Sequence, residues 1–511
     1  MQYSTLNIEY AIRNTQYALI LSIPYCVLCI FLSACVPIIP PPSPTSSPLF
    51  QFSTPTFALS SATPLPTRAI IAPGQPLSYT VQTGDTVQAL AVHFNTTVAE
   101  IIAANPPLPI TTTLPSGEVI TIPAYFFPLG GPTFQIIPDS EFVYGPANKD
   151  FDIDEYLQST PGYLKDLTAY ANEQTRTSAQ TIQYVAEQYS INPKLFLALM
   201  EWRSGALTQA SVRPEVADNP YGLNDGPRGF YLQSLWVAEQ LGAGYYGWRA
   251  GTLTSIQFAD TRRSRVDMYQ NAGTVGVQYL LAQMFSLDDF DAMASPAGFA
   301  ATYSALWGNP FATRPPDVIP GGLTQPELAL PFLENQQWSL TGGPHPGWGS
   351  GDLNPWAALD MAPPLGETGC IGTEKFVTAS APGVVVRTND STVILDLDGD
   401  GYEQTGWVIF YFHMARSEII AAGTKVNTGD PLGHPSCEGG HATGTHTHLA
   451  RKYNGEWLPA NGLVDGVLPF VIGGWTAEKS DAPYKGRLVR VGAWVEACTC
   501  STAANKVYWV R

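Results

Sequence analysis

Residues 443–450 read TGTHTHLA and place two histidines, His446 and His448, two positions apart. Successive side chains of a β-strand point to opposite faces, so two residues at this spacing project from the same face. Two imidazoles on one face of a strand can share a metal ion. A surface strand rich in Thr and His has the same spacing, so the surrounding sequence has to decide between the two interpretations.

Histidines gather in the C-terminal third of the chain, where six of the seven lie: His345, His413, His434, His441, His446 and His448. The same window contains TVILDL, TGWVIFYFHM and THTHLAR, which have the composition of strands and are separated by turns rich in Gly and Asp. Strand alternation puts His413 on one face with Trp407, Ile409 and Tyr411, from where it can reach the same cleft. We therefore predict an antiparallel β domain over residues 340–475, followed by a C-terminal extension, 476–511.

Several spaced motifs in residues 343–460 resemble the lysostaphin-type zinc metallopeptidases, and most closely their beta-lytic and staphylolysin branch. The matching segments are Gly343-Pro344-His345, Ala358-Leu359-Asp360, Tyr411-Phe412-His413, Cys437-Glu438-Gly439-Gly440 and Thr443-Gly444-Thr445-His446-Thr447-His448. The resemblance implies that His345, Asp360 and His448 hold one Zn²⁺, that His446 is the general base, and that His413 stabilises charge on the reacting carbonyl.

These roles are chemically consistent with the residue types. Three nitrogen and oxygen ligands leave the fourth tetrahedral position of zinc for water, and zinc lowers the pKa of that water toward 7. His446 can take the proton and hand it to the leaving amine, while His413 can donate to the oxyanion.

The sequence departs from the commoner branch of the family, which has a histidine four residues before the aspartate. Trp356 occupies that position here. In the beta-lytic branch the histidine lies further upstream on a loop, and His345 meets that pattern. We interpret His434 and His441 as polar loop residues, although either could be a substitute ligand.

The N-terminus resembles a bacterial lipoprotein signal. Tyr17 to Ala34 is apolar and uncharged, and Leu32-Ser33-Ala34-Cys35 resembles a lipobox. We expect residues 1–34 to be a signal peptide, Cys35 to carry the lipid anchor, and the Pro-rich segment 35–76 to be an extended tether. The alternative is an uncleaved transmembrane helix. Both place the rest of the chain outside the cytoplasm, and we expect it to be lipid-anchored to the bacterial cell membrane.

Residues 77–124 resemble a LysM domain, the βααβ module that binds glycans containing N-acetylglucosamine. Thr86 can cap a helix carrying Val87, Leu90 and Phe94, and Thr97 can begin a second helix. Such a module could also be a spacer. His93 is a lone histidine on an amphipathic helix, which favours a packing role.

Residues 150–335 show apolar spacing near 3.6, so we expect a mostly helical middle domain. The segment NPKLFLALMEWRSGALT resembles the start of the lysozyme-like transglycosylase fold, but Arg203 stands where that family has its catalytic glutamate. Arginine keeps its proton and cannot act as a general acid. Glu201 is about 200° away around the helix. We predict an inactive lysozyme-like domain; the alternative is an unrelated helical spacer.

Four cysteines remain once Cys26, Cys29 and Cys35 are assigned to the signal and the anchor: Cys370, Cys437, Cys498 and Cys500. Four cysteines allow three pairings. We favour a disulfide between Cys370 and Cys437, because each lies within a dozen residues of a proposed ligand and the bridge would brace the metal site; Cys498 and Cys500 could also bind zinc. The loop DLDGDG at 396–401 imitates the start of an EF-hand but has Trp407 at its twelfth position, which favours a hairpin turn.

The whole sequence predicts a multidomain protein. Its 511 residues are too many for one core, and a formal charge of −17 without a basic stripe argues against nucleic acid as a partner. The expected function is that of a zinc endopeptidase that cuts peptide crosslinks of peptidoglycan and binds its glycan through LysM. The alternative is a non-catalytic wall-binding or regulatory lipoprotein whose peptidase domain is a scaffold.

Overall fold

The computed structural model describes residues 71–125, 131–223, 225–313, 316–349 and 354–509. The expected signal peptide, the anchor Cys35 and most of the tether lie outside the described residues. The described residues belong to one compact unit.

The N-terminal module has the predicted βααβ order. It consists of β1 (Gln75–Thr80), α2 (Val87–His93), α3 (Val98–Ala104) and β2 (Val119–Ala124), and the two strands pair antiparallel. The side chain of Thr86 caps α2, and Thr97 with Glu100 forms a capping box at α3. No single helix among the described residues is long and apolar enough to cross a membrane; α2 and α3 pass such a test only as a pair bent by 108°.

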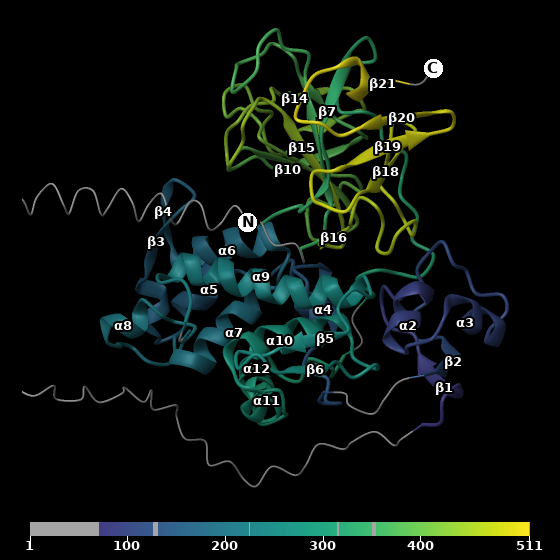
Figure 1. The fold of residues 1–511 in the computed structure, drawn as a ribbon. Helices are drawn as coiled ribbons and strands as arrows, with labels where there is room; N and C mark the ends of the chain where they lie inside the picture. Colours follow the sequence, from purple (N-terminus) through teal and green to yellow (C-terminus); the bar gives the residue numbers. More distant parts are fainter. Residues whose placement is uncertain (1–70, 126–130, 224, 314–315, 350–353, 510–511) are drawn as a thin grey trace, which may run out of the picture. The chain divides into compact units, whose positions relative to one another are not determined.

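The middle region is mostly helical, as predicted (Figure 1). Its helices are α4 (Asp139–Phe142), α5 (Ile153–Gln158), α6 (Ser178–Tyr189), α7 (Pro193–Ser204), α8 (Pro214–Ala217), α9 (Phe230–Arg249), α10 (Ala272–Met284), α11 (Leu287–Met293) and α12 (Phe299–Trp307). Two short hairpins join them, β3 (Thr168–Ala171) with β4 (Gln174–Thr177) and β5 (Ser255–Gln257) with β6 (Arg263–Arg265). Helices α9 and α10 pack so closely that a Cβ on Gly244 would lie 2.7 Å from the carbonyl oxygen of Val275, so only glycine fits there.

The C-terminal region is an antiparallel sheet in the order β13-β10-β11-β12-β15-β8-β7-β21, with β16 paired to β15. The strands are β7 (Gln337–His345), β8 (Ala358–Ala362), β10 (Gly383–Arg387), β11 (Thr392–Asp396), β12 (Trp407–Phe412), β13 (Lys425–Val426), β15 (Thr447–Tyr453), β16 (Glu456–Trp457) and β21 (Lys506–Tyr508). The short strands β9 (Val377–Thr378) and β14 (Pro431–Gly433) form a separate two-stranded sheet.

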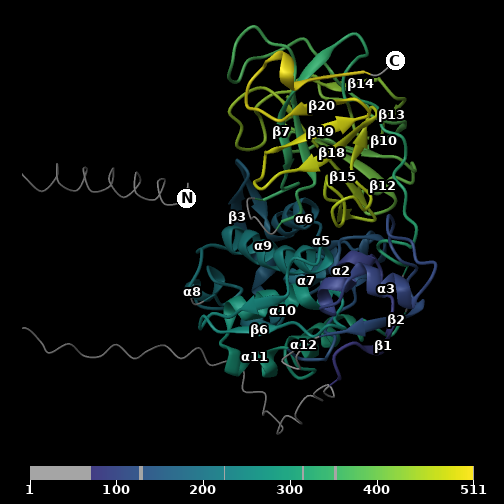
Figure 2. The ribbon, with the colours of Figure 1, turned by 45° about the vertical axis from the view of Figure 1, so that its right-hand side comes forward.

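The C-terminal extension packs into the same β-rich region as the large sheet. Together with β17 (Val471–Ile472), it forms a four-stranded sheet whose other strands are β18 (Trp475–Lys479), β19 (Gly486–Arg490) and β20 (Ala493–Glu496); Figure 2 shows this sheet beside β7. Its buried Trp475 and Leu488 share one core with Ile409 and Tyr411 of β12. The expected division at residue 475 therefore falls within β18.

The other face of β12 and β15 packs toward the helices. Phe410, Phe412 and Ala450 belong to the same apolar core as the buried residues of the middle region. Arg249 at the end of α9 adds a buried polar contact, because its guanidinium donates to Glu456 at 3.0 Å and to Asp139 at 3.1 Å. The central strands are thus buried on both faces.

Candidate metal centre

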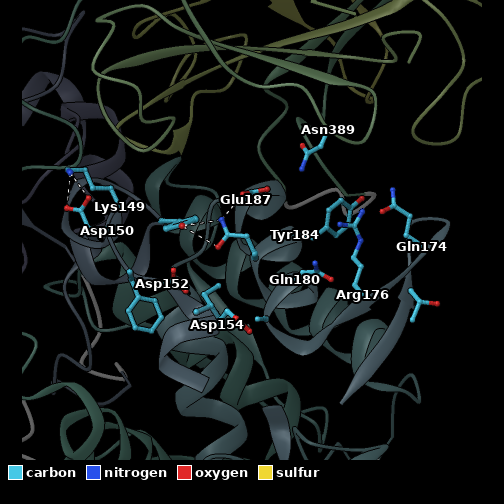
Figure 3. Close-up of a pocket in the computed structure, with 16 residues that line it drawn as sticks. Lys149, Asp150, Asp152, Asp154, Gln174, Arg176, Gln180, Tyr184, Glu187 and Asn389 are labelled. Carbon is cyan, nitrogen blue, oxygen red and sulfur yellow. Dashed lines mark hydrogen bonds and ion pairs between the residues drawn. The ribbon is translucent and has the colours of Figure 1, made fainter. Parts of the chain in front are cut away.

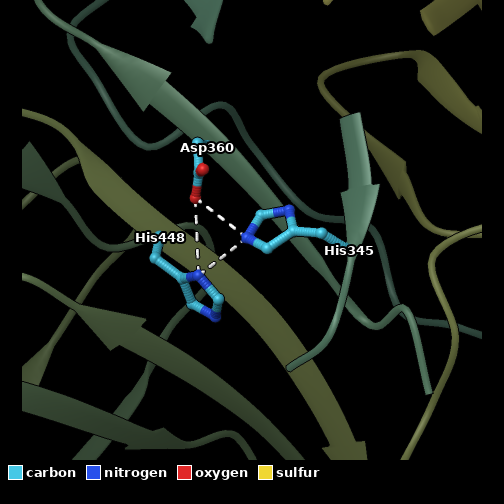
Figure 4. Close-up of side chains that lie close together, drawn as sticks. All are labelled: His345, Asp360 and His448. Atoms are coloured by element: carbon cyan, nitrogen blue, oxygen red, sulfur yellow. Dashed lines mark hydrogen bonds and ion pairs between the residues drawn. The ribbon is translucent and has the colours of Figure 1, made fainter. Parts of the chain in front are cut away.

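Three of the predicted site residues converge at one point of the large sheet (Figure 4). Nε2 of His345 lies 3.0 Å from Nδ1 of His448. Oδ1 of Asp360 lies 3.2 Å from the first nitrogen and 3.4 Å from the second. His345, Asp360 and His448 are 1%, 7% and 8% exposed as whole residues, so the cluster is shielded from bulk water.

The register of three adjacent strands produces this convergence. His448 on β15 lies directly opposite Asp360 on β8, and Asp360 lies opposite Gly342 on β7. The register of β7 shifts twice between Leu340 and His345, which brings the last residue of that strand round to the other two.

The hydrogen bonds of the two imidazoles fix which nitrogens face inward. Nδ1 of His345 is 2.8 Å from the carbonyl oxygen of Gly343, and Nε2 of His448 is 3.1 Å from that of Gly347. A carbonyl only accepts, so in the neutral rings these outer nitrogens carry the hydrogens and the inner nitrogens present lone pairs.

The three atoms that face one another in the centre are therefore all hydrogen-bond acceptors. Among the described residues, no hydrogen-bond donor satisfies Oδ1 of Asp360, which is buried. Two imidazole lone pairs and a carboxylate oxygen facing one another, with the outer nitrogens held by carbonyls, are the donor set of a zinc site with one open position. The residues present fit Zn²⁺.

The electrostatics agree with this arrangement. Burial alone would raise the pKa of Asp360, but the positive charge that His345 and His446 carry when they are protonated outweighs burial and holds that pKa well below its usual range. Burial lowers the pKa of His448. An ionised carboxylate beside neutral imidazoles is the protonation state that a metal ion requires.

Two further histidines lie beside the three converging residues. The ring of His446 is 4.6 Å from that of His413, centroid to centroid, and Nε2 of His446 is 3.7 Å from Oδ1 of Asp360. Nδ1 of His446 lies 2.7 Å from the carbonyl oxygen of Gly444, which leaves its Nε2 free to accept a proton.

The comparisons with known proteins identify domains and relatives of this chain. The sequence profile of the LysM domain matches residues 79–123, and that of the N-terminal domain of LasA matches residues 135–317. Protease LasA of Pseudomonas aeruginosa is 26% identical over 351 residues, which is 66% of this chain and 78% of the relative. The beta-lytic metalloendopeptidase of Lysobacter enzymogenes is 30% identical over 149 residues, which is 28% of this chain and 76% of the relative.

The chain belongs to the lysostaphin-type metallopeptidases. It is a metalloendopeptidase with a LysM domain, and its cofactor is Zn²⁺. Among solved structures, the deep-sea metalloprotease pseudoalterin is 23% identical, with a TM-score of 0.28, over 34% of this chain and 96% of that one. No comparison tests the lysozyme-like interpretation of the middle domain, which stays a prediction.

Two details of the peptidase site differ from the sequence-based expectation. His345 was expected on a loop, but it is the last residue of β7, because β7 pairs with β8 up to that point. The alternation argument for His413 was wrong: it placed this histidine with Ile409 and Tyr411, which face the opposite core. His413 follows the end of β12 with φ of 60°, and this left-handed turn directs its ring to the side of His446.

The protonation of His413 bears on its predicted role. Its Nδ1 lies 2.9 Å from the carbonyl oxygen of Glu438 and therefore donates the hydrogen. Burial, and then the charges of His446 and His448, lower the pKa of His413 to about 3. The ring is therefore neutral in the free protein, and it can donate from Nε2 only after it gains a second proton.

A disulfide joins Cys370 to Cys437, the pairing favoured from the sequence. The loop beside Cys370 is bonded to Thr445, whose backbone N–H donates to Gly369 at 3.0 Å. The bridge thus braces the residue that precedes His446. Cys498 pairs with Cys500.

Tyr484 is a site residue that the sequence did not indicate. It lies in the turn between β18 and β19, and its ring stacks on His345 with 4.1 Å between centroids. Its backbone N–H donates to Pro344, and its carbonyl oxygen accepts from Gly343. No spacing relates a tyrosine so far downstream to the histidines, so only the fold reveals it.

The remaining candidates lie away from the metal centre. His434 bonds to the carbonyl of Lys375 and to Glu418, and His441 lies exposed on a loop. The acidic residues of 396–401 form part of the turn between β11 and β12, where the carboxylate of Asp396 accepts several backbone N–H groups. Arg203 donates to the carbonyls of Tyr221 and Gly222.

Proposed function

We propose that this protein is a zinc-dependent endopeptidase that cuts peptide crosslinks in bacterial peptidoglycan. The observation that carries the proposal is the convergence of two imidazole lone pairs and the Asp360 carboxylate, with His446 beside them. The LysM domain supports a substrate that contains glycan. The names of the relatives, a protease and a metalloendopeptidase, support peptide-bond cleavage.

The metal ligands are His345, Asp360 and His448. When bound, zinc polarises the scissile carbonyl and lowers the pKa of a water molecule toward 7. The carbonyls of Gly343 and Gly347 orient the two imidazoles. The Asp360 carboxylate would offset one of the two positive charges of Zn²⁺.

His446 is the general base. The carbonyl of Gly444 holds the hydrogen on Nδ1, so Nε2 can accept the proton of the attacking water and return it to the leaving amine. His413 stabilises negative charge on the reacting carbonyl. Because its Nδ1 already donates to Glu438, its Nε2 can donate to that carbonyl only once it has taken up a proton from solvent, which developing negative charge would favour and burial opposes.

We further propose that the chain is tethered to the cell membrane through lipid on Cys35. The proposal is supported by the apolar, uncharged run from Tyr17 to Ala34 and by the small residues before the cysteine. The Pro-rich segment that follows would hold the folded domains away from the membrane surface.

The test is a digest of purified, crosslinked peptidoglycan by the full-length protein, read by mass spectrometry. We expect new peptide ends at crosslinks, no new sugar reducing ends or anhydro sugars, and no products from the His446→Ala variant. New sugar ends from His446→Ala would show that the middle domain cleaves glycan. Intact crosslinks with the zinc-loaded wild-type protein would refute the proposed function.

A further inference from the structure

The middle domain contains a cavity of about 680 Å³ that is separate from the metal centre. Its walls are Tyr144, residues 149–154 before and in α5, residues 174–176 of β4, one face of α6 between Ala179 and Glu187, and Asn389 in the turn between β10 and β11. Its volume lies within the range of small-molecule sites, which often form where domains meet. In Figure 3 the labelled side chains extend from Lys149 and Asp150 on one side to Arg176 and Gln174 on the other, so the cavity is elongated.

Cationic groups in the cavity wall are already neutralised by the protein. Nζ of Lys149 lies 2.8 Å from Asp150 and 3.8 Å from the centre of the Tyr402 ring. The guanidinium of Arg176 lies 2.7 Å from Asp390 and stacks over Tyr184. Neither cation is free to bind a phosphate or carboxylate, and the wall adds Asp152, Asp154 and Glu187, so an anionic ligand is disfavoured.

The cavity instead offers groups that suit hydroxyls. Four amide side chains line it: Gln174, Gln180, Gln183 and Asn389. The amide of Gln183 is engaged by Tyr144 and Glu187, and Oδ1 of Asn389 accepts from Arg387. The amide of Gln174 and the amide hydrogens of Gln180 and Asn389 remain for a ligand. Oε1 of Gln180 accepts from the backbone N–H of Thr177, which leaves its amide hydrogens for a ligand. Within the described part of the chain, the side chains of Gln174 and Asp154 have no hydrogen-bond partner.

One partly exposed aromatic ring, that of Phe151, completes the wall; the rings of Tyr144 and Tyr184 border it but are buried. A sugar ring presents hydroxyls at its edge and C–H groups on its faces, so amides together with an aromatic ring match both kinds of surface. We propose that this cavity binds an uncharged saccharide segment, a stretch of the glycan strand of peptidoglycan. The proposal deepens the proposed function and rests on it.

The cavity is linked to the peptidase site by a short turn. Asn389 lines the cavity, and two residues later the carbonyl of Ser391 accepts from the backbone N–H of Met414, which follows His413. The middle domain holds this turn, because Asn172 and Arg176 both bond to Asp390. A glycan segment in the cavity therefore lies against the turn that supports the end of β12.

The test uses the full-length protein in detergent and calorimetric titration with chitotetraose, an uncharged oligomer of N-acetylglucosamine. Wild-type protein should bind at two sites, the LysM domain and the cavity. Thr175→Trp should fill the cavity and leave one site, or weaken the second at least tenfold. Thr168→Trp, on the paired strand of the same hairpin and outside the cavity, should keep both.

Gln180→Ala removes an amide donor without filling the space, and it should weaken the same site if the Trp variant does not fold. Equal binding by wild type, Thr175→Trp and Gln180→Ala would overturn the inference. Binding of a free stem peptide at the cavity, without binding of chitotetraose there, would also overturn the inference. Failure of every protein, wild type included, to cut crosslinks would count against the proposed function alone, because saccharide binding is measured separately.

Discussion

Gly342 stands where a side chain would collide with a proposed metal ligand. A Cβ at this position would lie 2.5 Å from Oδ2 of Asp360, so Gly342→Ala should displace the carboxylate. We expect zinc affinity to fall about 10- to 100-fold while the fold persists, as for other changes that misorient a ligand. Competition with a chelator measures the effect.

The matched control is Gly366→Ala, because a Cβ there has no neighbour within 4 Å among the described residues. Equal zinc affinity in the two variants would contradict the placement of Asp360 in the metal centre.

At the scale of elements, the loop that carries the Cys370–Cys437 disulfide holds the start of β15. Replacing both cysteines by alanine should lower the free energy of unfolding by about 2–4 kcal/mol. Peptidase turnover should also fall, because Thr445 beside His446 is bonded to this loop. Denaturant unfolding and a crosslink assay measure the two effects.

The control for the disulfide is the Cys498→Ala, Cys500→Ala double variant. That bridge closes a loop with a sequence separation of only 2, so its loss should change stability little. If both double variants behave alike, the loop of Cys370 does not brace the site.

The contact between α2 and α9 should be sensitive to acid. The ring of His93 stacks on Trp248 at 3.6 Å, and burial lowers its pKa to about 3. Between that value and its ordinary value of about 6.5, the unfolded chain binds a proton that the folded protein does not, so stability falls as pH falls.

We expect the protonation of His93 in the unfolded chain to lower the free energy of unfolding by about 2–3 kcal/mol when the pH falls from 7 to 4.5. His93→Gln should therefore lose less thermal stability on acidification than wild type does, whereas exposed His441→Gln should resemble wild type. An identical loss in all three proteins would show that His93 does not govern this response.

For the whole molecule, membrane attachment depends on residue 35. Cys35→Ala should move the protein from the membrane fraction to the soluble fraction, since no thioether-linked lipid can form. Retention in the membrane fraction with the signal uncleaved would favour the transmembrane alternative.

The helical middle region and the β-rich C-terminal region follow from residue periodicity, and the LysM caps at Thr86 and Thr97 follow from local chemistry. The candidate site was predictable for a different reason, because its motifs are spaced as in a known family. Alternation failed at His413, since a single left-handed residue reverses the face of a strand. Tyr484 could not be predicted, because its contact with His345 depends on how the C-terminal sheet packs on β7.

The most direct test of the metal centre measures zinc content and crosslink cleavage together in single-residue variants of the full-length protein. His345→Ala, Asp360→Ala and His448→Ala should each lose most of the zinc and all activity, because a three-ligand site cannot spare one ligand. His446→Ala should keep stoichiometric zinc and lose turnover, while His434→Ala and His441→Ala should keep both. If His345→Ala still carries stoichiometric zinc and cuts crosslinks, the account of the metal centre is wrong.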